Sequence, residues 1–144
     1  DHWELDGLAL YLEHEFRTAR LLSDLAHDEC EYYLITEAKE YVGFLKINYE
    51  SSPEQSNLNS CELEKIYILP KYGGRGIGRR AMTQVFEMAR VRNKQQLILC
   101  VIDTNTAAIA FYQKLGFRFH SRARLEVPHF KEELRGMHRM LLEL

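Results

Sequence analysis

The segment that most constrains the fold is residues 63–82, in which an apolar strand runs into a glycine-rich turn and the turn opens a basic helix. Glycines within this segment allow the backbone to approach a ligand closely. The first turn of the helix presents backbone N–H groups without intrahelical partners and the positive end of the helix dipole. A strand, a glycine-rich turn and a helix in this order therefore predict an α/β unit with a phosphate-binding site.

Two widespread phosphate-binding motifs do not match this turn. A P-loop needs Gly-Lys followed by Ser or Thr, but Gly78 is followed by Arg79 and Arg80, and no hydroxyl is present to bind magnesium. A dinucleotide-binding turn needs G-x-G-x-x-G and an acidic residue about 20 positions later. Residues 76–81 fit that spacing only in part, and residues 92–96 contain no acid. The P-loop is rejected and the dinucleotide fold is weakly supported.

The hydrophobic pattern predicts one domain over residues 1–144. Apolar residues at helical spacing predict helices over residues 3–16, 18–26, 77–89 and 105–115, the last ending at Gly116 with a left-handed cap. Strands are expected over residues 31–37 and 41–49, which form a hairpin, and over 61–69, 96–102, 117–127 and 137–142. A hairpin followed by a strand–helix–strand crossover predicts a mixed sheet, and residues 51–60 read as a loop.

Charge is unevenly distributed along the chain, although the net charge is only -2. Residues 1–50 carry twelve acidic and four basic residues, whereas residues 70–94 carry one acidic and seven basic residues. The basic segment predicts a polyanionic ligand and the acidic segment a cationic one, unless both are solvated surfaces. The basic run is short and lacks interleaved aromatic residues, which disfavours nucleic-acid binding.

Several other functions are disfavoured by what the sequence lacks. Its three cysteines contain no C-x-x-C pair, its six histidines show no metal-ligand spacing, and no G-x-S-x-G motif occurs. We therefore expect no metal centre, no disulfide framework and a cytoplasmic protein. The longest apolar run, residues 97–102, is far shorter than the roughly 20 residues of a membrane span, and no signal peptide is expected.

Two motifs resemble the GCN5-related N-acetyltransferase (GNAT) family. Its first motif, Q/R-x-x-G-x-G/A after an aliphatic strand, is matched by Ile66-Tyr67-Ile68, Pro70 and Gly76-Ile77-Gly78, with Gly73 at the Q/R position. Its second motif, N-x-x-A-x-x-x-Y-x-x-x-G-F, is matched at every fixed position by residues 105–117, NTAAIAFYQKLGF. The resemblance covers residues 40–120 and is greatest to PaiA-type polyamine acetyltransferases.

The resemblance implies a fold with helices on both faces of the sheet and acetyl-CoA bound between residues 66–68 and residues 97–102. Family members usually begin with a further strand and helix, so we expect the chain, which starts at Asp1, to be a processed or truncated piece. The cofactor-binding residues carried over are Ile66, Tyr67, Ile68, Gly74, Arg75, Gly76, Ile77, Gly78, Arg79, Asn105 and Lys114. Asn105 is equally typical of a plain helix N-cap, and the two roles are compatible.

The resemblance also assigns catalytic roles. Tyr112 is expected to protonate the departing thiolate, and a backbone N–H near Ile68 is expected to meet the oxyanion. Glu64, and after it Glu62, is the expected base, since the two share one face of a strand unless a bulge intervenes. Cys100 stands where some relatives carry a glutamate, so that version of the base is absent, and Tyr33 and His120 are weaker candidates for lining an acceptor pocket.

Together these features predict transfer of acetyl from acetyl-CoA to a primary amine, plausibly a polyamine or another small cation. Two alternatives remain open: acetylation of protein or peptide amino groups, and a catalytically silent acyl-CoA-binding module. The expected partners are a small amine and CoA, with no nucleic acid and no membrane, and a homodimer is left open.

Overall fold

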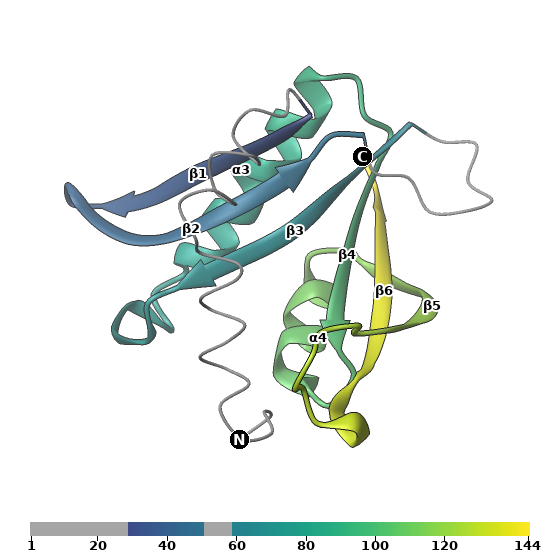
Figure 1. Ribbon diagram of the computed structural model, residues 1–144. Coiled ribbons are helices and arrows are strands. Elements are labelled where there is room, and N and C mark those ends of the chain that lie inside the picture. The colour runs from purple at the N-terminus through teal and green to yellow at the C-terminus, as the bar shows by residue number, and fades with distance from the viewer. Residues whose placement is uncertain (1–28, 51–58) are drawn as a thin grey trace. The chain divides into compact units, whose positions relative to one another are not determined.

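The computed structural model describes residues 29–50 and 59–144. In these residues it has six strands, two α-helices and two short 3₁₀ helices, in the order β1 (Cys30–Glu37), β2 (Glu40–Asn48), β3 (Ser60–Ile68), η1 (Pro70–Tyr72), α3 (Ile77–Val91), β4 (Gln96–Ile102), α4 (Thr106–Lys114), β5 (Arg118–Arg124), η2 (Glu132–Leu134) and β6 (Gly136–Glu143). The strands form one sheet in the order β1-β2-β3-β4-β6-β5 (Figure 1). The expected helices at residues 3–16 and 18–26, and most of the expected loop, lie outside the described residues.

The sheet is mixed, as the sequence predicts. Strands β1, β2 and β3 pair antiparallel, and β3 pairs parallel with β4. The parallel pairing covers three residue pairs, from Ser60 with Gln96 to Glu62 with Ile98, although β3 has nine residues and β4 has seven. The class and the sheet of the predicted fold are thus confirmed.

The described chain divides into two compact units, and the larger holds residues 29–50, 59–99 and 141–144. Its strands β1 to β3 form a meander, and α3 runs along one face of that meander (Figure 1). The buried side chains of α3 lie at helical spacing, at Ile77, Ala81, Met82, Val85 and Ala89. This stripe is the apolar face that the sequence predicts, and it packs the helix onto the sheet.

The predicted hairpin is present, with a turn geometry that its residue types do not favour. Ala38 and Lys39 connect β1 to β2, and both have positive φ angles, of 49° and 68°. Two successive left-handed residues make the tight turn that matches strand twist, and this turn usually selects Asn and Gly. Beyond the turn the register shifts, with Ile35 opposite Gly43 but Thr36 opposite Tyr41, which leaves Val42 as an extra residue in β2.

Strand β2 approaches β3 very closely at Gly43. A Cβ atom placed there would lie 2.1 Å from the carbonyl oxygen of Tyr67. Any larger residue would push the two backbones apart, so this glycine sets the spacing between β2 and the end of β3.

Strand β3 contains the bulge that would separate Glu62 from Glu64. Lys46 lies opposite Lys65 and Ile47 opposite Leu63, so Glu64 is the extra residue of β3 at this point. A bulge of this kind bends the strand and redirects a side chain. Even so, Glu62 lies opposite Asn48, and the Glu64 carboxylate contacts Asn48 and Lys46, so both acids remain on the face of the sheet that carries these two β2 side chains.

The second unit, described over residues 100–140, contains α4, β5, η2 and most of β6. The expected cap at the end of α4 is confirmed, because Gly116 has a φ of 105° and the N–H of Phe117 donates to the carbonyl of Tyr112 at 3.0 Å. Strand β5 is shorter than predicted, ending at Arg124, and β6 is slightly longer.

Candidate functional site

The glycine-rich turn is anchored by a buried side chain at each end. Tyr72 precedes it and Ile77 follows it, and both pack with Val42 in one apolar cluster to which Ile35 and Ile68 add partly buried side chains. The hydroxyl of Tyr72 also donates to the Glu40 carboxylate. The backbone between the two anchors is therefore held in place without a regular hydrogen-bond ladder.

Two glycines in the turn are required by their backbone angles rather than by lack of space. Gly74 has a φ of 73° and Gly76 a φ of 76°, and a Cβ atom at either position would meet nothing within 4 Å. Left-handed angles disfavour residues that carry a Cβ. Gly73 differs, because its φ of -64° suits any residue. The departure from the family motif at Gly73 is thus not imposed by backbone geometry.

The backbone amides of residues 74–79 are free to bind a ligand. Tyr72 and Gly73 donate backwards to Leu69 and Pro70, and Arg80 donates to Gly76 at 3.1 Å. Between them, no backbone hydrogen bond within the described residues uses the amides of 74–79, and no side chain caps α3. Clustered N–H groups at the positive end of a helix dipole are what a phosphate requires.

The arginines around the turn are held differently from one another. Arg80 donates to Glu37 at 2.9 Å, and Arg75 lies 4.0 Å from the same carboxylate, with its guanidinium 5.2 Å from the centre of the Tyr72 ring. Arg79 is exposed, and no ion pair within residues 29–50 and 59–144 involves it. Glu37 thus holds two of the three cations, and Arg79 remains available to an anion.

The expected cofactor strand, Ile66-Tyr67-Ile68, directly precedes this turn. All three residues pair with β2, and none pairs with β4, because that ladder ends at Glu62. Tyr67 is half exposed and lies 6.2 Å from the Phe44 ring, centre to centre. The strand therefore ends beside the turn with its β2 side already paired.

The first-choice base, Glu64, is held by two side chains of β2. Lys46 Nζ lies 2.7 Å from Glu64 Oε2, and Asn48 Nδ2 donates to Glu64 Oε1 at 3.2 Å. Glu62, the second choice, is half-buried at the start of β3 next to the pairing with β4. The two carboxylates thus differ in their position, with Glu64 at the bulge and Glu62 beside the parallel pairing with β4.

In the second unit, Asn105 caps α4. Its Oδ1 accepts from the N–H of Ala108 at 3.2 Å, which confirms the N-cap interpretation and leaves its carboxamide NH₂ group as a donor. Lys114 is exposed in the last turn of the helix. Cys100 is partly buried and unoxidised, consistent with a small apolar residue.

Tyr112 is packed between two phenylalanine rings. Its ring centre lies 5.3 Å from that of Phe111 and 5.7 Å from that of Phe117, both edge to face. Burial raises the pKa of the Tyr112 phenol above its ordinary value, because the phenolate would lose water. The side chain is therefore a protonated phenol at neutral pH, and no hydrogen bond to its hydroxyl occurs within the described part of the chain.

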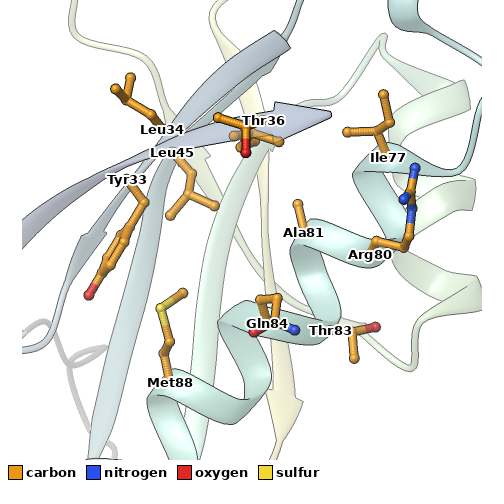
Figure 2. A pocket seen from close by; sticks show the side chains of 11 residues that line it. Tyr33, Leu34, Thr36, Leu45, Ile77, Arg80, Ala81, Thr83, Gln84 and Met88 are labelled. Atoms are coloured by element: carbon orange, nitrogen blue, oxygen red, sulfur yellow. The ribbon is translucent and has the colours of Figure 1, made fainter. Parts of the chain in front are cut away.

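A groove of about 500 Å³ that the sequence did not predict lies between β1 and α3. Residues 33–36 of β1, Leu45 of β2 and six residues of α3 line it, and Figure 2 shows Leu45, Ala81 and Met88 around this space. Tyr33 contributes to it, as part of a largely apolar lining, whereas His120 lies on exposed β5. No local pattern could indicate the groove, because its two walls are about 40 residues apart in sequence.

The described residues contain neither a cluster of candidate metal ligands nor a helix suited to crossing a membrane. No group of three or more His, Cys, Asp or Glu side chains there is arranged to hold a metal ion. Among the helices in the same residues, none has the length and apolar character to cross a bilayer.

Comparison with known proteins identifies one family. The model of the acetyltransferase (GNAT) family matches residues 2–117. A thialysine N-epsilon-acetyltransferase of Sus scrofa is 41% identical over 56 residues, which are 39% of this chain and 33% of that protein. The matched segment thus spans about a third of the length of this curated relative.

Solved structures share the fold at low sequence identity. A PaiA N-acetyltransferase from Thermoplasma acidophilum in complex with coenzyme A superposes with a TM-score of 0.75 at 14% identity, over 99% of this chain and 80% of that one. A chimeric spermidine N-acetyltransferase, SpeG from Vibrio cholerae and hSSAT, has a TM-score of 0.70 at 18% identity, over 87% of this chain and 74% of that one.

Proposed function

We propose, since the chain belongs to the acetyltransferase (GNAT) family, that it transfers an acetyl group from acetyl-CoA to a primary amine. The observation that carries the proposal is the turn between Tyr72 and Ile77, where the amides of residues 74–79 have no backbone partner among the described residues and lie at a helix start without a side-chain cap. A diphosphate is the ligand that such a set of donors fits best.

In this proposal the cofactor is bound from the turn outwards. The amides of residues 74–79, among them those of Gly74, Gly76 and Gly78, hold the pyrophosphate, and Arg75 and Arg79 add charge. Ile66, Tyr67 and Ile68 supply backbone groups for the pantetheine chain, whose amides need partners of this kind. Asn105 and Lys114 complete the set carried over from the second motif. Bound CoA in the PaiA structure supports this choice of ligand.

The reaction requires a base, a group that stabilises the oxyanion, and an acid. Glu64 takes a proton from the acceptor ammonium, directly or through water, with Glu62 as the second choice for this role. The neutral nitrogen then attacks the thioester carbonyl carbon, and a backbone N–H near Ile68 stabilises the oxyanion. As the C–S bond breaks, the thiolate takes the phenolic proton of Tyr112, and the second proton that the acceptor nitrogen loses on becoming an amide passes through water to the phenolate and restores the phenol. Burial raises the pKa of this phenol, so Tyr112 carries its proton at neutral pH before the step.

A small cationic amine is the proposed acceptor, with a polyamine as the first candidate. Residues 1–50 carry twelve acidic against four basic residues, which attracts a cation. Two similar proteins are a thialysine N-epsilon-acetyltransferase and a spermidine N-acetyltransferase, and both substrates present primary amines on alkyl chains. If the chain acetylates peptide amines but not spermidine, the proposed acceptor is a protein or peptide amino group and not a polyamine.

A silent acyl-CoA-binding module is the second candidate, and one observation favours it. Gly73 stands where the family motif has Gln or Arg, and its φ of -64° would have allowed either residue. The φ angle therefore does not explain the missing side-chain contact. A Cβ at this position would lie 3.2 Å from the Pro70 carbonyl oxygen, which gives a packing reason for glycine, and loss of catalysis is a second reason.

The deciding experiment compares the wild-type chain with Tyr112→Phe, measuring thiol release from acetyl-CoA with a panel of amines. We expect turnover in the wild type and a rate at least about 10-fold lower in the variant, with CoA binding unchanged, because only the proton donor is removed. Tyr41→Phe, which removes the hydroxyl of an exposed tyrosine on β2, is the matched control. Bound CoA without turnover on any amine would leave the silent module as the function.

A further inference from the structure

Lys46 is a buried charged residue, with 4% of the residue exposed. Its neighbours Leu45 and Ile47 are also buried, and Leu45 lines the groove on the α3 side of the sheet. Since successive side chains of a strand alternate between faces, Lys46 points to the opposite face, toward Tyr32, whose ring centre lies 5.6 Å from Nζ. Burying an ammonium group lowers stability unless the charge is paired, so the burial of Lys46 needs a structural or functional explanation.

One partner of Lys46 is the carboxylate that the mechanism uses. Lys46 Nζ contacts Glu64 Oε2 at 2.7 Å, while Asn48 holds the other oxygen, and Asn48 is itself fixed because its Oδ1 accepts from the N–H of Glu50 at 3.0 Å. Both oxygens of Glu64 are therefore tied to β2. The register next to the bulge pairs Ile47 with Leu63 and Asn48 with Glu62, so Glu64 lies beside Lys46 and Asn48 on the same face of the sheet.

We propose that Lys46 is a positioning residue that fixes the Glu64 carboxylate for the acceptor amine, an inference that rests on the proposed function. Each carboxylate oxygen keeps a second lone pair after accepting one hydrogen bond, so a carboxylate held by Lys46 and Asn48 still accepts from an ammonium group or a water. A carboxylate without these contacts would sample several rotamers, and catalysis depends on the orientation of the base. Lys46 touches neither substrate nor cofactor in this scheme and acts only through Glu64.

A double-mutant cycle tests this inference. We expect Lys46→Met and Glu64→Gln each to lower kcat about 10-fold or more, and the double variant to be no slower than Glu64→Gln within about 2-fold, because both changes remove one function. KM for acetyl-CoA should stay unchanged throughout. Lys46→Arg keeps a cation with several donors and should recover part of the lost kcat.

Lys94→Met is the matched control. Lys94 has a side chain that is 8% exposed, similar to the 5% of Lys46, and it lies 3.6 Å from the Glu50 carboxylate. It stands outside the proposed site, so its removal should lower the melting temperature without lowering kcat. If Lys94→Met lowers kcat as much as Lys46→Met does, the loss of activity reflects the loss of a buried ion pair and of stability in general. That result would overturn the inference.

The remaining outcomes also decide the question. An effect of Lys46→Met that is as large in the Glu64→Gln background as in the wild type overturns the inference while the proposed function stands. If Lys46→Met does not fold, Asn48→Ala replaces it, and its expected loss of kcat, about 3-fold, should vanish in the Glu64→Gln background. If the wild-type chain turns over no amine, the proposed function is wrong, and the inference about Lys46 is wrong with it. This outcome differs from the one above, in which only the inference is overturned.

Discussion

The two described α-helices begin in opposite ways. At the start of α4, the Asn105 side chain accepts from the N–H of Ala108, so one of the unpaired donors is used within the protein. At the start of α3, Gly76 offers no side chain, and the amides before and after it have no partner in the described residues. Helix starts are normally capped because unpaired donors are costly.

This difference separates a structural helix start from a ligand-binding one. Asn105 stabilises α4 in the absence of any ligand, whereas α3 lacks such a cap and relies on the burial of Ile77 and Tyr72. An anion that reaches α3 therefore meets donors that need not first break a protein hydrogen bond. In free-energy terms, α3 gives up about 1 kcal/mol of capping and regains it when a ligand binds.

The largest effect should follow a change that breaks the geometry at α3. Gly76→Ala places a Cβ at a φ of 76°, which costs about 1–2 kcal/mol or forces the turn to change shape. We expect CoA to bind about 10-fold more weakly or worse in isothermal titration calorimetry, because the amides no longer converge. Gly73→Ala, at an ordinary φ, is the control, and equal losses in both variants would contradict the distinction between the two glycines.

The second prediction concerns the capped helix. Asn105→Ala should lower the free energy of unfolding by about 1 kcal/mol, since the N–H of Ala108 loses its acceptor. Asn105→Asp keeps an accepting oxygen and should restore stability in denaturant titrations. If Asn105→Asp is stable but binds CoA several-fold more weakly than the wild type, the carboxamide NH₂ also serves the cofactor. A stable Asn105→Ala would remove the contrast between the helices.

The smallest effect is expected at Gly73. Gly73→Gln restores the side chain of the family motif at a position whose backbone already suits it, although its Cβ would lie 3.2 Å from the Pro70 carbonyl oxygen. We expect CoA binding to tighten by about 2- to 5-fold, the amount that one exposed polar contact supplies. Weaker CoA binding would mean that a side chain at position 73 blocks access to the α3 amides, and that glycine is needed there to keep them accessible.

Most elements could be predicted from the sequence because their signals are local. The range of β4 was predicted without error from one apolar run, and the start of α3 at Ile77 follows from the glycines before it. The Asn105 cap and the Gly116 terminus were equally predictable, since both depend on residue types within one helix. The hairpin was predicted, but the left-handed geometry of its turn at Ala38 and Lys39 was not, because neither residue type favours positive φ.

The surroundings of the candidate base could not be predicted. Glu64 and Lys46 are 18 positions apart, and their contact depends on the register of β2 and β3. Register is a property of two strands together, and a change of one residue moves side chains to the other face. The pair of acids in β3 was visible in the sequence, but which of them has a fixed orientation was not.

The close approach of β2 and β3 at Gly43 affects how mutational intolerance at this position should be interpreted. A saturation scan of this chain should find Gly43 as intolerant as Gly74 and Gly76, although it lies in a strand and contacts no ligand in the proposed scheme. The turn glycines have room for a side chain but the wrong backbone angle, whereas at Gly43 the carbonyl of Tyr67 occupies the place of a Cβ. Intolerance at Gly43 therefore reports the distance between two strands, and a catalytic role should not be inferred from it.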